Sequence, residues 1–227
     1  MNTHYVTKEF KGDFMRIKQN VPRIKNMIVN YIYNNIKEYM LISLLFIIGI
    51  FIGVIIINNC NETQLKEITK YISEFIDKFK NIENLDRMSL IMSSIKNNII
   101  LAIIIWVAGT TVIGVPIVLV TILFRGMCLG YTIAAITYTL GTMKGIMFCI
   151  ASLCAQSIVF IPAILSLGVS SIKLYKSIVK DRRKENIKIE IIRHTFFSLL
   201  MLIILILSSF VENVISIPIL QNVIKFF

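Results

Sequence analysis

An uncharged run, residues 99–124, constrains this chain more than any other part of its sequence. The run is longer than the roughly 20 apolar residues that cross a bilayer as a helix. It contains Gly109, Gly114 and Pro116. These residue types weaken a helix in water, but in lipid they allow neighbouring backbones to approach closely and the helix to bend. The sequence therefore predicts a membrane helix that packs against other helices.

The composition of the 227 residues is typical of a membrane protein. Hydrophobic residues make up 56% of the chain and charged residues 16%, and the mean hydropathy is +0.76, which excludes a soluble core as the main organiser. The formal net charge of +11 raises nucleic acid as an alternative partner. However, no array of aromatic and basic residues accompanies the charge, and the basic residues flank apolar segments. We therefore expect an anionic lipid surface as a partner and no nucleic acid.

Five apolar segments are candidate spans, at residues 40–57, 99–124, 127–140, 146–172 and 195–217. The third has only 14 residues, so its length leaves open a short span, a re-entrant segment or a buried helix. Residues 1–39 and the loop 173–194 are rich in Lys and Arg, which places both in the cytoplasm by the positive-inside rule. The loop 58–98 has balanced charges and is expected outside. An odd number of crossings must join that loop to the second basic loop, so the third segment spans.

The predicted fold class is an all-α membrane protein with five transmembrane helices, a cytoplasmic N-terminus and an extracytoplasmic C-terminus, with residues 218–227 as the outer tail. Arg125 and Gly126 separate the second and third segments. We expect a tight cytoplasmic turn there, with the arginine reaching toward water and the glycine removing bulk. Gly126 and Gly130 are four residues apart, as are Gly49 and Gly53, a spacing that lets helices pack closely.

Two amphipathic regions flank the first span. In the outer loop, apolar residues at alternating steps of three and four predict a helix with a stripe formed by Leu65, Ile68, Ile72, Phe75, Phe79 and Ile82. A second, shorter helix is expected from Asp86 into the second span. The stripe either packs on the protein's own outer membrane face or receives a partner protein, and both alternatives stay open. Before the first span, basic amphipathic helices meeting near Pro22 are expected to lie on lipid headgroups.

Residues for catalysis or metal binding are scarce, with two histidines and four cysteines. No nucleophile and base pair or metal-ligand spacing is recognisable, so we expect no enzyme and no cofactor. Gln156 is the most central polar side chain of the apolar segments and is expected to hydrogen-bond to a neighbouring helix. The alternative is a transporter or permease subunit with a midplane site near Pro116, Gln156 and Pro162. The apolar segments hold no Asp or Glu away from their ends, which counts against it.

The order of glycines, prolines and the basic residue resembles the stage II sporulation protein M family from about residue 37 to the C-terminus. The residues that carry this resemblance are Gly109, Gly114, Pro116, Arg125, Gly126, Gly130 and Pro162. The resemblance implies a non-enzymatic scaffold of the engulfment machinery in the mother-cell membrane at the sporulation septum. It also implies stage II sporulation proteins D and P as partners, which degrade septal peptidoglycan as a lytic transglycosylase and an amidase with endopeptidase activity. A homo-oligomer stays open.

Overall fold

The computed structural model describes residues 26, 29–80, 87–111, 114–180, 184–212, 214 and 219. The chain divides into two compact units between Met40 and Leu41, and each unit is described by itself. In the first unit, the side-chain amide of Asn35 donates a hydrogen bond of 2.6 Å to the carbonyl oxygen of Tyr31. The amphipathic helices expected near Pro22 lie outside the described residues.

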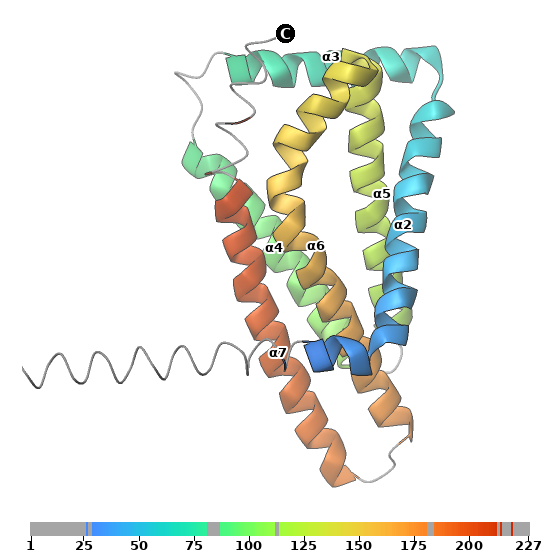
Figure 1. The fold of residues 1–227 in the computed structure, drawn as a ribbon, viewed down its shortest axis with the longest axis vertical. Coiled ribbons are helices and arrows are strands. Elements are labelled where there is room, and N and C mark those ends of the chain that lie inside the picture. Colours follow the sequence, from blue (N-terminus) through green and yellow to red (C-terminus); the bar gives the residue numbers. More distant parts are fainter. Residues whose placement is uncertain are drawn as a thin grey trace, which may run out of the picture. The chain divides into compact units, whose positions relative to one another are not determined.

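Six helices with defined bounds lie in the described part of the chain, which contains no strand (Figure 1). They are α2 (Ile36–Asn58), α3 (Glu62–Lys80), α4 (Arg87–Gly109), α5 (Gly114–Leu140), α6 (Thr142–Lys180) and α7 (Lys184–Val211). Five stretches are long and apolar enough to cross a membrane: Ile36–Asn58, Ile91–Gly109, Gly114–Leu140, Ser157–Val179 and Ile187–Val211. The all-α class with five transmembrane helices is confirmed. The cytoplasmic and outer orientation of the termini stays a prediction.

The predicted turn at Arg125 and Gly126 is wrong, because α5 continues through both residues. The chain reverses earlier, between α4 and α5, where the amide of Thr111 donates to the carbonyl oxygen of Ala108 and that of Gly114 to Thr111. A Cβ at position 114 would overlap the Ala108 carbonyl oxygen, so this turn needs glycine. An arginine interrupts a run of apolar residues but does not end a helix, since its helix propensity is high. The second, third and fourth spans therefore have other limits than the sequence indicated.

Pro116 lies in the first turn of α5, where the missing N–H of proline leaves no helical hydrogen bond unmade. Three helices still join the outer loop to the second basic loop, so the orientation argument is unchanged.

The position of Arg125 differs from the predicted one. Arg125 is the twelfth of 27 residues in α5. It is about 16 Å along the helix from the α4–α5 turn, close to half the thickness of a ~30 Å hydrocarbon core.

Helices α2 and α5 touch backbone to backbone. The contact is lined by four glycines, Gly49, Gly53, Gly126 and Gly130. A Cβ at any of them would overlap a carbonyl oxygen of the opposite helix; at Gly126, for example, it would overlap that of Phe46. Each small-residue pair therefore faces the other, and the nearest atoms at all four positions belong to the backbone of the opposite helix.

Helix α6 packs against α5 and α7, and α4 packs against all three. Two buried polar groups join these helices. Asn98 of α4, 2% exposed, donates hydrogen bonds to the Leu205 carbonyl oxygen (3.2 Å) and the Ser209 hydroxyl (2.8 Å) of α7. His194 of α7, also 2% exposed, has its Nδ1 2.8 Å from the Ser170 hydroxyl of α6. Buried polar atoms need such partners in lipid, so these bonds fix the helices in register.

Candidate functional site: the groove beneath α3

The predicted outer amphipathic helix is present as α3 and lies across α5 and α6 (Figure 1). Its start is capped by one bond of the capping-box type, since the Asn61 amide donates to the side-chain oxygen of Gln64 at 3.1 Å. The carbonyl oxygen of Asn61 in turn accepts the first helical bond, from Leu65. The shorter helix expected from Asp86 into the second span corresponds to the start of α4 at Arg87.

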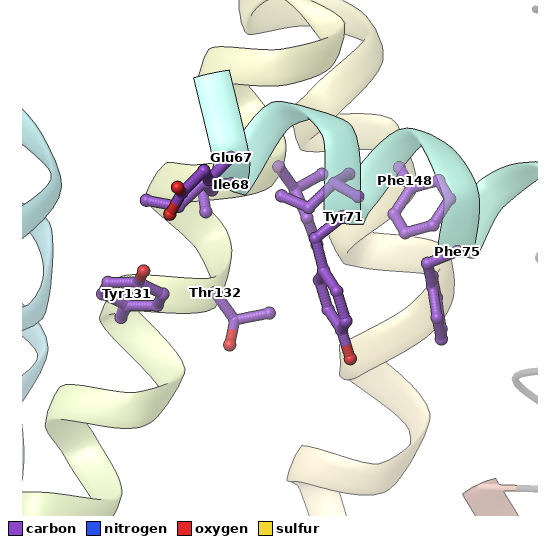
Figure 2. A pocket seen from close by; sticks show the side chains of 10 residues that line it. Glu67, Ile68, Tyr71, Phe75, Tyr131, Thr132 and Phe148 are labelled. Atoms are coloured by element: carbon purple, nitrogen blue, oxygen red, sulfur yellow. The ribbon is translucent and has the colours of Figure 1, made fainter. Parts of the chain in front are cut away.

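An apolar groove of about 540 Å³ lies between α3, α5 and α6 (Figure 2). Its lining residues are Glu67, Ile68, Tyr71, Ile72 and Phe75 from α3, Tyr131, Thr132, Ala135 and Ile136 from α5, and Phe148 from α6. Most of this lining is hydrocarbon or aromatic ring. A groove of this chemistry suits an apolar segment with few polar groups.

The α3 stripe is only partly buried on the bundle, and its reception of a partner protein stays a prediction. Ile68 and Ile72 of the stripe are half-buried at the groove, so part of the stripe anchors α3 on the bundle. Ile76, which the sequence reasoning did not include in the stripe, is 6% exposed and adds to this anchor. Phe75 is 41% exposed and can still contact another molecule. Leu65 is half-buried beside a neighbouring hollow that Tyr138 of α5 also lines. The side chain of Phe79 is outside the described residues.

Tyr71 is a groove residue that the sequence reasoning missed. It is 72% exposed, and Figure 2 shows it projecting from α3 on the same side as Phe75. The signal in the sequence was its type, because tyrosine combines an apolar ring with a polar tip and is enriched where membrane and water meet. Two exposed aromatic rings therefore border the groove.

Arg125 lines a second, smaller hollow of about 130 Å³ on the same face of α5. The other lining residues are Phe46 from α2, Cys128, Leu129 and Thr132 from α5, and Ser157 and Phe160 from α6. The Arg125 guanidinium carbon lies 4.6 Å from the centre of the Phe160 ring, within the range of a cation–π contact. Arg125 is thus placed inside a span and not at a turn.

Glu212, one residue beyond the fifth span, is the acidic group that acts on Arg125. Burial raises the pKa of Glu212, whereas a hydrogen bond from Ser94 and the positive charge of Arg125 lower it. The field of Glu212 offsets part of the arginine's charge. The guanidinium itself contacts the Phe160 ring.

The residues of the expected midplane site do not converge. Gly168 of α6 lies beside Ile122 of α5, and the two helices run antiparallel across the turn at Gly141. Pro116 comes six residues before Ile122 in α5, and Pro162 comes six residues before Gly168 in α6. Because the helices are antiparallel, the two prolines lie on opposite sides of the Ile122–Gly168 contact, about 18 Å apart along the helices. The side chain of Gln156 is outside the described residues.

The Ser170–His194 pair is buried at the contact of α6 and α7, and Gly109 of α4 adjoins it. A Cβ at Gly109 would meet the Ser171 hydroxyl at 2.5 Å and the His194 Nε2 at 2.8 Å. The pair therefore joins helices and faces no groove described above. Among the described residues, no group of three or more His, Cys, Asp or Glu side chains could hold a metal ion.

One comparison with known proteins gives a match. The family model described as stage II sporulation protein M matches residues 42–217 of this chain. No curated protein and no solved structure matches. The matched range covers the groove, the Arg125 hollow and the glycine contact of α2 with α5.

Proposed function

The chain belongs to the stage II sporulation protein M family and is a multi-pass membrane protein of sporulation, and from this premise we propose that it is a scaffold of the engulfment machinery. In this proposal it recruits and localises peptidoglycan hydrolases, stage II sporulation proteins D and P, at the septum and in the engulfing mother-cell membrane. The observation that carries the proposal is the groove beneath α3 with its two exposed aromatic rings.

The groove has the features of a protein-binding surface. Aromatic residues are enriched among those that contribute most to binding, and Tyr71 and Phe75 stand exposed at its border. The charge argument puts α3 on the outer side of the membrane, the side on which peptidoglycan lies. The anchored part of the stripe and the glycine contact of α2 with α5 hold this surface on a fixed support.

The test is capture of the two hydrolases from sporulating cells by a tagged chain. Phe75→Glu puts a charge at the border of the groove and should reduce recovery of proteins D and P at least tenfold, since a truncated interface anchor costs ~2 kcal/mol or more. Glu74→Gln, at an exposed position of the same helix, is the matched control. Recovery is normalised to the amount of chain in the membrane. Equal recovery by both variants would refute docking at this groove.

A transporter or permease subunit is the second candidate, favoured by Arg125 inside a span beside a hollow. Charged residues within membranes often mark binding sites for substrates or ions. The backbone contact of α2 with α5 opposes this candidate, because alternating access requires groups of helices to move against one another. Substrate-dependent flux into vesicles that hold the purified chain would favour it over the scaffold.

A further inference from the structure

A single face of α5 connects the groove beneath α3 to the hollow at Arg125. Thr132 lines both. The residues of this face recur at helical spacing: Arg125, Cys128, Leu129, Thr132, Ala135 and Ile136. The face is about 16 Å long from Arg125 to Ile136, which is three helical turns. We call this continuous surface, with Phe46 of α2 and Phe160 of α6 at its walls and α3 at its end, the α5 groove.

The guanidinium of Arg125 offers five N–H donors to this groove. Within the part of the chain that the structure describes, no hydrogen-bond acceptor contacts them, and the cation rests on the Phe160 ring. Arg125 is only half-buried, and Thr132 beside it is exposed. A charged side chain at this depth of a membrane is costly unless an opposite charge or polar atoms meet it. The Phe160 ring and the field of Glu212 meet part of this cost, and the exposed part of Arg125 leaves room for a further anion near the middle of the span.

We propose that the α5 groove binds a transmembrane helix of a partner protein, and that an Asp or Glu side chain of that helix pairs with Arg125. The inference rests on the proposed scaffold function and extends it by giving the chemistry of the partner. Charge complementarity supplies the first argument, because ionisable residues within membranes pair with one another.

The small residues of the groove supply the second argument. Cys128 and Thr132 are four residues apart on this face, and Cys128 is half-buried while Thr132 is exposed. Small side chains at this spacing let a neighbouring helix approach closely. A lipid fits less well, since its anionic headgroup lies at the membrane surface and Arg125 is near the middle of α5.

The test uses the full chain in nanodiscs of phosphatidylethanolamine and phosphatidylglycerol. The probe is a labelled Leu/Ala peptide of about 20 residues with one central Glu, long enough to span the membrane. A peptide with Leu at that position is the reference. Energy transfer between labelled chain and peptide measures binding. We expect about tenfold tighter binding of the Glu peptide, since a polar contact between membrane helices contributes ~1–2 kcal/mol.

Three variants connect that preference to the groove. Arg125→Met should abolish it, Arg125→Lys should keep part of it, and Arg193→Met, at a surface arginine paired with Glu190, should leave it unchanged. Thr132→Leu fills the groove at an exposed position and should weaken binding of both peptides. This variant keeps the proposal testable if Arg125→Met does not fold. Equal binding of the Glu and Leu peptides, or full preference in the Arg125→Met variant, would overturn the proposal.

Two further measurements separate the alternatives. Binding of a labelled fatty acid that depends on Arg125, without any preference for the Glu peptide, would overturn the partner helix and assign a lipid carboxylate to the groove. If the Glu peptide shows no preference but Phe75→Glu still loses the hydrolases, the scaffold stands and this inference fails. If the preference depends on Arg125 but Phe75→Glu recovers the hydrolases fully, the inference stands and the docking site proposed above fails.

Discussion

Gly130→Ala should destabilise the protein through the backbone contact of α2 with α5. The new Cβ would lie 2.8 Å from both the Cα and the carbonyl carbon of Ile50, and it would overlap the carbonyl oxygen of that residue. Carbon atoms in ordinary contact are about 3.5–4.0 Å apart, so the helices must separate by about 1 Å, which forfeits a quarter to a half of the dispersion energy along the contact. We expect the free energy of unfolding to fall by about 2 kcal/mol, as for other overpacked cores.

Gly168→Ala is the matched control, because its Cβ would also meet a close neighbour, the Cδ1 of Ile122 at 2.5 Å. That atom is the end of a flexible side chain and can rotate away, so the cost should stay below about 1 kcal/mol. Both variants gain the same helix propensity, and their difference isolates the backbone contact. Unfolding by SDS in mixed micelles can be followed by the fluorescence of the single tryptophan, Trp106. Equal stability of the two variants would refute the reasoning.

Three further variants can be measured by the same unfolding assay. Asn98→Leu removes two buried hydrogen bonds to α7 and should lower the free energy of unfolding by about 1 kcal/mol; an unchanged value would mean that these bonds contribute no net stability. His194→Ala should cost about 2–4 kcal/mol, because it leaves a cavity and an unpaired Ser170 hydroxyl, and a smaller cost than that of Asn98→Leu would contradict this. Pro116→Ala should change stability by less than about 0.5 kcal/mol, since first-turn prolines interrupt no helical bond, and a large loss would assign the proline a further contact.

The sequence predicts the class of this fold well because membrane spans depend on length and hydropathy. It predicts α3 because the stripe at Ile68 and Ile72 repeats with the period of a helix, whereas the cap at Asn61 and Gln64 was found only in the structure. It cannot locate the turn between α4 and α5, where apolar and hydroxyl residues continue the uncharged run.

The candidate site was predictable only in part, since it depends on which helices are neighbours. Phe75 was identified from its place in the amphipathic stripe. The Arg125 hollow was not predicted, because a single charged residue between two apolar segments is compatible both with a loop and with one long helix that contains a charge. Phe160, which lies 35 residues further along the chain, takes part in the hollow only through the packing of α6 on α5.

The glycine contact of α2 with α5 also has a consequence for biosynthesis. Gly49 emerges from the ribosome 77 residues before Gly126, so at 5–20 residues per second the first span waits about 4–15 s for its partner. That span is the most apolar of the five and can enter the bilayer by itself, whereas α5 carries Arg125 and enters at a cost. The early helix thus provides a docking surface for the later one. Substitutions that weaken its glycine face should therefore reduce the fraction of chains in which α5 inserts, even where the stability of the correctly inserted protein is unchanged.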